Sequence, residues 1–148
     1  MKSHSLILLA ISLAVAAACT RSKSSNSVGS AVNPLLRIEA LPPADNQKVS
    51  AVRDMKNWKN PYLIVRTDGV GLLDPANNEQ KILTPDQLLA ALADLPSSAW
   101  PYGRVVAVTE SFPTGSSDAD KAQLRRNRAL VAGTLESLHV VINWVPSA

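Results

Sequence analysis

Few side chains of this chain could carry out catalysis, and they do not form a recognised catalytic motif. Ser111 follows Glu110, but the sequence around it lacks the Gly-x-Ser-x-Gly pattern that presents a nucleophilic serine on a sharp turn. His139 is the only histidine beyond position 18, and with no patterned acid beside it a structural role is favoured. A hydrolase would need the fold to bring Ser111 or Glu110 to His139, so we expect a protein without enzymatic activity.

Charged side chains offer two possible binding sites instead. Asp118 and Asp120, with Glu110, supply the carboxylate oxygens that hard cations prefer, yet aspartates also gather at helix N-termini without any ion. We therefore expect neither a metal nor a cofactor. Arg125 and Arg128, one helical turn apart, could hold an anion or a carboxylate, or could lie on a solvated helix face. Glu110, Arg125 and Arg128 are the candidate binding residues.

The only cysteine, Cys19, directly follows an apolar segment near the start of the chain. One cysteine excludes an intramolecular disulfide and a Cys-x-x-Cys metal site. Residues 6–18 (LILLAISLAVAAA) follow the basic Lys2 and are too few to cross a bilayer, which takes about 20 residues, so they predict a cleaved export signal. The tetrapeptide at 16–19, Ala-Ala-Ala-Cys, resembles the lipobox of bacterial lipoproteins, although Ala16 stands where leucine is usual. An ordinary export signal that happens to end at a cysteine is the alternative.

The lipobox resemblance implies that the Cys19 thiol receives a diacylglyceryl group and that Cys19 becomes the first residue of the mature chain. Acyl chains such as palmitate hold a protein on a membrane without a spanning helix, since each buried CH2 contributes about 0.8 kcal/mol. Thr20 is not the aspartate that retains lipoproteins of Gram-negative bacteria in the inner membrane. The resemblance therefore implies a cell-envelope protein on the periplasmic face of the outer membrane, unless the source bacterium has a single membrane.

The excess of basic over acidic side chains lies outside the C-terminal part of the chain. The pI is near 9.2, but residues 61–148 contain seven basic and nine acidic side chains, whereas residues 20–60 contain seven basic and three acidic ones. An acidic, exported domain is not a credible partner of nucleic acid. The basic residues after the anchor either lie near anionic lipid head groups, each contributing about 1 kcal/mol, or are simply solvated.

Composition divides the 148 residues into four segments. Residues 19–33 are rich in serine and nearly free of large apolar side chains, which predicts a flexible tether. Within 34–60, alternating apolar residues over 36–40 predict a short strand, and apolar residues three apart over 49–55 predict a short helix. The predicted segments are a signal peptide (1–18), a tether (19–33), a mixed extension (34–60) and a folded domain (61–148).

The domain segment carries the patterns of a small α+β fold. Asp68 and Gly69 separate two apolar runs and predict a hairpin with a type I′ turn. A capping box at Thr84 precedes leucines spaced along one helix face, and Ser117 with the acidic residues after it begins a second helix. The predicted order is strand, strand, helix, strand, helix, strand (β-β-α-β-α-β), which favours a small two-layer α+β sandwich.

The aromatic residues of the domain give weaker signals. Trp100 and Tyr102 lie in a loop with proline and glycine, and they form either an exposed contact surface or a lid on the core. Trp144 belongs to the last predicted strand and is expected to be packed rather than functional.

The order of elements over residues 61–146 resembles the periplasmic domain of ExbD/TolR proteins. The resemblance rests on the hairpin at Asp68 and Gly69, on the helix over 84–95, and on the entry to the third strand over 102–106. Those proteins are held by a spanning helix with a proton-coupling aspartate, which this chain lacks. The resemblance therefore implies only the fold and binding to other envelope proteins.

Residues 105–138 also resemble the OmpA-like peptidoglycan-binding domain found on Pal-type lipoproteins. Thr109 and Glu110 stand at the family's Thr-Asp pair, and Leu124 and Arg128-Ala129 stand at its Leu-Ser and Arg-Ala positions. The resemblance implies that Glu110 and Arg128 contact the diaminopimelate of a peptidoglycan stem peptide. The chain departs from the family in having Glu110 for aspartate, Lys121 for asparagine and Arg125 for serine.

Together, these patterns predict a non-enzymatic lipoprotein whose periplasmic α+β domain binds another envelope protein. Peptidoglycan binding by an OmpA-like domain is the first alternative, and a periplasmic hydrolase is the second.

Overall fold

The computed structural model describes residues 33–74 and 79–147. The predicted signal peptide, the lipobox with Cys19 and the tether up to residue 32 lie outside the described residues. Among the helices that are described, none is long and apolar enough to cross a bilayer. The elements in chain order are α1 (Pro34–Glu39), α2 (Asn46–Ala51), β1 (Tyr62–Val65), β2 (Val70–Asp74), β3 (Glu79–Leu83), α3 (Leu88–Asp94), β4 (Val105–Glu110), α4 (Asp118–Ser137) and β5 (Val141–Trp144), with short 3-10 turns at Met55–Asn57, Pro85–Gln87 and Ser97–Ala99.

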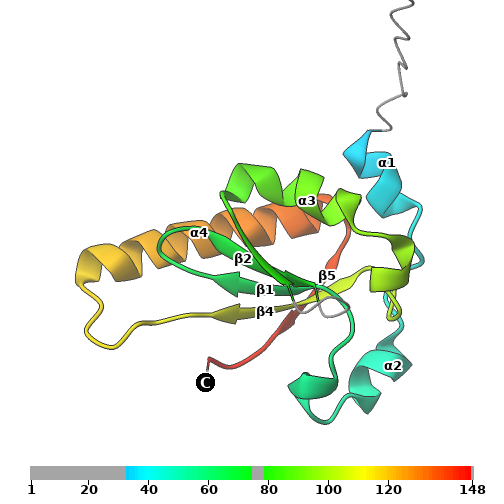
Figure 1. The fold of residues 1–148 in the computed structure, drawn as a ribbon, viewed down its shortest axis with the longest axis horizontal. Helices are drawn as coiled ribbons and strands as arrows, with labels where there is room; N and C mark the ends of the chain where they lie inside the picture. Colours follow the sequence, from blue (N-terminus) through cyan, green and yellow to red (C-terminus); the bar gives the residue numbers. More distant parts are fainter. Residues whose placement is uncertain (1–32, 75–78, 148) are drawn as a thin grey trace, which may run out of the picture. The chain divides into compact units, whose positions relative to one another are not determined.

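The strands form one five-stranded mixed sheet in the order β3-β2-β1-β4-β5. β1 pairs antiparallel with β2 and parallel with β4, and β5 pairs parallel with β4. α3 and α4 cover the same face of the sheet (Figure 1), and α4 is the crossover between the parallel strands β4 and β5. This arrangement confirms the predicted α+β class.

Alternating side chains of β4 contribute to two hydrophobic cores. Val106 and Val108 lie in the larger core with the buried leucines of α3 and α4, whose burial matches their predicted helical spacing. Val105 and Ala107 point to the opposite face, where they pack with Trp58. The segment around α2 therefore covers part of the sheet face that α3 and α4 leave open.

Residues 34–60 belong to the same compact unit as the rest of the described chain. The strand predicted over residues 36–40 is wrong, because most of them lie in α1. The Oδ1 atom of Asn33 accepts a hydrogen bond from the N–H of Leu35 (3.0 Å), and Pro34 is the first helical residue; both features favour a helix start. The helix expected over residues 49–55 is divided between α2 and the 3-10 turn that follows it.

Two features of the sheet differ from the prediction. No apolar alternation marks β3, because four of its five side chains are exposed. The predicted hairpin of β1 and β2 forms, but its loop spans residues 66–69, and Gly69 alone in this loop has a positive φ, so the turn is not type I′. Asn127 of α4 donates through Nδ2 to the carbonyls of Arg66 (2.7 Å) and Thr67 (3.3 Å), which holds the loop in this longer form.

The capping box predicted at Thr84 is present, and a second one, not predicted, begins α4. The Oε1 of Gln87 accepts a hydrogen bond from the N–H of Thr84 (3.1 Å), and Thr84 caps the 3-10 turn Pro85–Gln87 that leads into α3. At the start of α4, the Oγ of Ser117 accepts from the N–H of Asp120 (3.1 Å) and the Asp120 carboxylate accepts from the N–H of Ser117 (2.9 Å). Hydrogen bonds from the Ser117 hydroxyl and N–H hold the pKa of Asp120 below its usual value. The acid is thus part of the helix start.

α4 ends in a Schellman motif built on His139. The N–H of Val140 donates to the carbonyl of Leu135 (3.0 Å), and the N–H of His139 donates to the carbonyl of Glu136 (3.0 Å). His139 has a φ of +52°, which is the left-handed conformation that glycine adopts most easily. Its place in the helix end gives this histidine a backbone role.

Replacing His139 by glycine is expected to stabilise the domain by about 1 kcal/mol, because glycine has no Cβ to strain the left-handed backbone. The free energy of unfolding, measured by urea denaturation, checks this. His139→Ala is the control, since alanine keeps the Cβ and should give no comparable gain. An equal gain from alanine would show that the imidazole, and not the backbone conformation, is the source of the strain.

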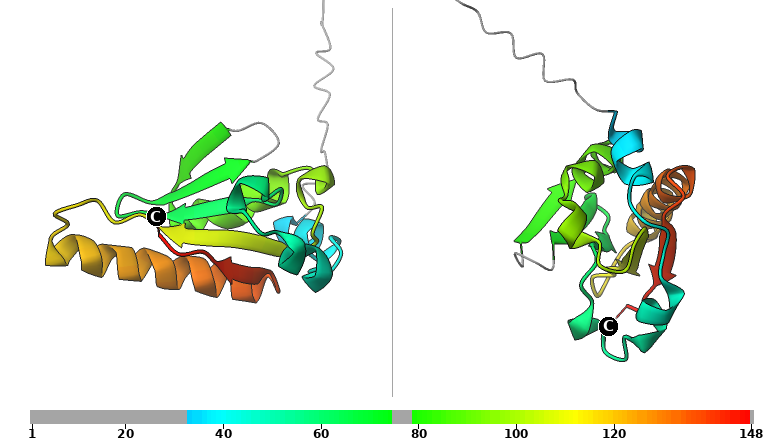
Figure 2. Two further views of the ribbon diagram at one scale, coloured as in Figure 1. Left: turned by 90° about the horizontal axis from the view of Figure 1, so that it is seen from below. Right: turned by 90° about the vertical axis from the view of Figure 1, so that its right-hand side faces the viewer.

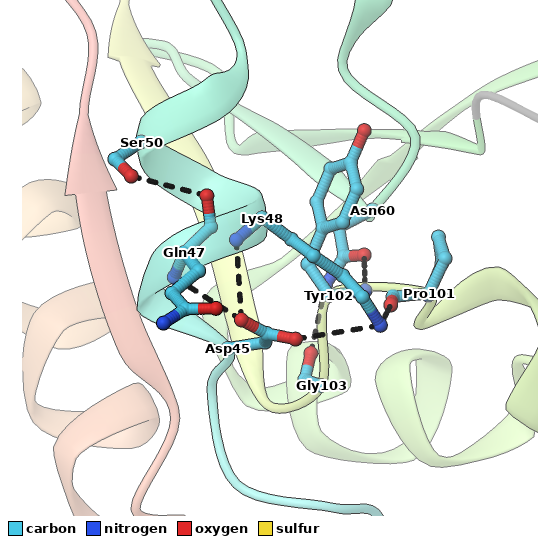
Figure 3. A network of polar contacts seen from close by, with 8 residues as sticks. All are labelled: Asp45, Gln47, Lys48, Ser50, Asn60, Pro101, Tyr102 and Gly103. Carbon is cyan, nitrogen blue, oxygen red and sulfur yellow. Dashed lines mark hydrogen bonds and ion pairs between the residues drawn. The ribbon is translucent and has the colours of Figure 1, made fainter.

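A buried asparagine ties the start of β1 to the loop before β4 (Figure 3). Asn60 is fully buried, and its Nδ2 donates to the carbonyls of Gly103 and Val105 at 2.8 Å each. Its Oδ1 accepts from the N–H of Tyr102 at 2.8 Å. These three bonds fix the beginning of β4, the strand whose far end carries the candidate site.

Candidate functional site

Three side chains from different elements meet at the carboxyl ends of β4 and β5. Glu110 is the last residue of β4, Trp144 is the last residue of β5, and Arg128 comes from α4. The Nη1 of Arg128 lies 2.6 Å from Oε1 of Glu110, and the guanidinium carbon lies 4.3 Å from the centroid of the Trp144 ring. Glu110, Arg128 and Trp144 are called the strand-end site below.

Strand and helix periodicity explain why these positions converge. Glu110 lies two residues after Val108, so both side chains point to the sheet face that carries α4. Trp144 is the partner of Val108 in the parallel pairing of β4 and β5, and it points to the same face. Arg128 follows the buried Leu124 by one helical turn, which directs it toward the sheet.

The strand-end site borders an open hollow of about 300 Å³. Residues after β5 complete its wall: Val145, Pro146 and Ser147. The Glu110 side chain is 18% exposed and that of Arg128 is 49% exposed, so water weakens their attraction only in part. The Arg128 cation above the indole adds about 0.5–1 kcal/mol.

Two of the three candidate binding residues predicted from the sequence are brought together. Glu110 and Arg128 form the ion pair of the strand-end site. Arg125 lies one turn before Arg128, is exposed, and does not line the hollow. Within the described residues, Arg125 makes no ion pair. Its guanidinium is therefore a free positive charge beside the site.

Trp144 was expected to be packed, and this is wrong, because its side chain is 41% exposed. A short apolar run does not reveal whether another strand covers it, and β5 is the last strand of the sheet. Trp100 is buried in the larger core, and Tyr102 contacts Trp58 edge to face with ring centroids 5.3 Å apart. Of the two alternatives for the loop, the lid on the core therefore fits both residues.

The residues considered for catalysis or metal binding lie elsewhere. His139 precedes β5, whereas Glu110 ends the parallel neighbour β4, so the two lie at opposite ends of this strand pair. Ser111 does not line the hollow. Asp118 pairs with Lys121 (3.1 Å), and among the described residues no three metal-ligating side chains form a cluster.

No family model, curated protein or solved structure matches this chain. What the site can bind therefore follows from its own chemistry. Glu110 offers a carboxylate, Arg128 has guanidinium donors beyond the one that contacts Glu110, and Trp144 offers a flat apolar surface. A ligand that carries both an ammonium and a carboxylate group could replace the ion pair, with its ammonium on Glu110 and its carboxylate on Arg128. Open α/β sheets commonly bind ligands at the carboxyl ends of their parallel strands.

Proposed function

We propose that this chain is a lipid-anchored protein of the bacterial cell envelope whose α+β domain binds another envelope protein, without catalysing a reaction. The observation that carries the proposal is the convergence of Glu110, Arg128 and the exposed Trp144 at one open hollow. Arginine and tryptophan are the residues most enriched among those that dominate protein–protein binding energy. A partly shielded ion pair beside them adds orientation to the contact.

Sequence features support the anchor and the location. The apolar run over 6–18 and the lipobox-like residues before Cys19 favour export and lipidation, and Thr20 favours the periplasmic face of the outer membrane. A lipid anchor and a water-exposed domain with an open binding hollow are compatible, because the anchor needs no contribution from the fold.

Peptidoglycan is the second candidate partner, and the ion pair of Glu110 and Arg128 favours it. The OmpA-like resemblance implies that these two residues share one ligand, and they are in direct contact although 18 positions apart in the sequence. Diaminopimelate carries ammonium and carboxylate groups, which match the two charges of the site. Glu110 and Arg125, which stand where that family has aspartate and serine, count against this candidate.

Arg128→Ala is expected to weaken partner binding at least about tenfold, which corresponds to 1.4 kcal/mol. The full chain is produced in bacteria with a photoreactive amino acid in place of Ser147, which lines the hollow. Cross-linking in intact cells, followed by mass spectrometry, should identify one envelope protein.

Mass spectrometry of the N-terminal peptide should show acyl chains on Cys19, and this modification should be missing in Cys19→Ala.

Arg126→Ala is the matched control, because Arg126 is the same residue type on the same helix but hydrogen-bonds to Gln123 (2.6 Å) away from the hollow. Purified peptidoglycan sacculi test the second candidate by co-sedimentation with the same variants. If Arg126→Ala sediments with the sacculi and Arg128→Ala does not, we would conclude that the partner is peptidoglycan and not a protein. Equal binding of all variants to both partners would reject the strand-end site as the binding surface.

A further inference from the structure

The strand β5 forms an open edge of the sheet. It is the last strand in the order β3-β2-β1-β4-β5 and is drawn in red in Figure 2. The N–H groups of Val141 and Val145 donate to the carbonyls of Arg104 (2.9 Å) and Val108 (2.8 Å). Because main-chain groups alternate along a strand, the N–H and C=O of Ile142 and Trp144 point away from β4, where no other strand of the described chain lies.

The two edges of the sheet differ in how they are protected. On β3, the exposed side chains include Glu79 and Lys81, charges that discourage a further strand from pairing. β5 has no charge and no proline, and two of its apolar side chains are open to water: Val141 is 49% exposed and Trp144 is 41% exposed. The β5 edge therefore lacks the charge and the proline that keep many strand edges from pairing, and only its length of four residues limits the pairing.

Charge beside the β5 edge indicates what could pair there. Arg128 covers Trp144 and is neutralised by Glu110, whereas Arg125, one turn earlier on α4, has no ion-pair partner among the described residues. An extended segment laid along β5 would therefore meet an unbalanced positive charge. A second copy of the chain would add a further Arg125 to this edge and not an acid that balances it, so charge favours an acidic segment over that occupant.

We propose that β5 accepts an extended segment of another envelope protein as an added strand, with an acidic side chain of that segment beside Arg125. The main-chain groups of Ile142 and Trp144 supply the ladder hydrogen bonds, and the hollow at Trp144 receives one side chain of the segment. The inference rests on the proposed binding of an envelope protein and adds how that partner is held.

Ile142→Pro tests the proposal, because proline removes the outward N–H while the bonds from β5 to β4 stay in place. The control Ile142→Val keeps this N–H and loses only one methylene. The probe is a phage-displayed library of random 12-residue peptides, selected on the full chain in detergent. The selected peptides should be acidic and rich in β-branched residues. They should bind Ile142→Val as they bind the wild type, and bind Ile142→Pro and Arg125→Glu at least tenfold more weakly.

Hydrogen exchange gives a readout that does not depend on any variant folding normally. A bound peptide should slow the exchange of the Ile142 and Trp144 amides of the wild-type chain at least tenfold. The proposal is overturned if no peptide is enriched, if the two amides exchange at an unchanged rate, or if Ile142→Pro binds the peptides as well as Ile142→Val. Sedimentation showing a dimer that Ile142→Pro dissociates would also overturn it, in favour of a second copy.

Failure of the added-strand proposal can be told apart from failure of the proposed function. If Ile142→Pro leaves cross-linking to the envelope partner unchanged while Arg128→Ala abolishes it, the partner binds at the strand-end site without an added strand. If Arg128→Ala also leaves the cross-link unchanged, the proposed function itself fails.

Discussion

Gly103→Ala is expected to destabilise the domain by about 3 kcal/mol. Gly103 has a φ of +74°, a conformation that costs a residue with a Cβ about 1–2 kcal/mol. A Cβ there would also overlap the carbonyl oxygen of Pro43 and lie 2.9 Å from that of Pro42. Relieving such overpacking costs about 1–3 kcal/mol. The neighbouring groups are backbone, so they cannot rotate aside.

Urea denaturation of the full chain measures this effect, and Gly115→Ala is the matched control. Gly115 also has a positive φ, +85°, but a Cβ added there would meet nothing within 4 Å. The control should therefore lose only the stability that the positive φ costs a residue with a Cβ, about 1–2 kcal/mol. If both alanine variants lost the same stability, the close approach of Gly103 to the Pro42 and Pro43 carbonyls would be energetically irrelevant.

Asn60→Ala is expected to cost about 3–4 kcal/mol, because three main-chain groups would each lose a hydrogen bond to this buried side chain at once. These are the carbonyl of Val105 and, drawn in Figure 3, the carbonyl of Gly103 and the N–H of Tyr102. The Gly103 carbonyl would keep one donor, the N–H of Val105 (2.8 Å). Each unsatisfied buried polar group costs about 1–3 kcal/mol. The three groups share one side chain, so their costs are coupled and we do not expect the full sum. The thermal midpoint and the urea midpoint should both fall.

Asn57→Ala provides the comparison, since Asn57 is exposed and its hydrogen bonds within the described part of the chain use only its backbone. Its N–H donates to the carbonyl of Asp54 (2.9 Å), and its carbonyl accepts from the hydroxyl of Tyr102 (3.2 Å). It should change stability by about 0.5 kcal/mol or less. Asn60→Asp should be no milder than alanine, because it replaces the two donors of Nδ2 by a buried negative charge. A stable Asn60→Asp variant would contradict the hydrogen-bond assignment. Asn60 and Gly103 share one network, so their double variant should lose less than the two losses added together.

Local signals made the long elements predictable. Ser117 caps the start of α4 where the sequence predicted a helix to begin, and the helical spacing of Leu124, Val131 and Leu135 identifies the buried face of α4. α1 and β3 were missed for opposite reasons. Apolar alternation suggested a strand where Asn33 and Pro34 start a helix, and β3 carries no alternation because most of its side chains face water.

The candidate site was predictable only in part. Glu110 and Arg128 were singled out from the sequence, but their contact depends on β4 and α4 packing together, which no local pattern encodes. Trp144 was assigned to the interior because sequence alone does not tell an edge strand from a central one. Asn60 gave no signal at all, since its partners lie more than 40 residues away.

The way the chain enters the domain determines how it would respond to mechanical load. α1 is the first described element, and it lies outside the sheet, packed on α3 through the buried Ile38 and an exposed ion pair of Arg37 with Asp94 (3.0 Å). Tension on the N-terminal segment would therefore reach α1 before any strand. Because α1 has only six residues and is held by one buried side chain, Ile38, and one exposed ion pair, we expect it to detach before the sheet opens.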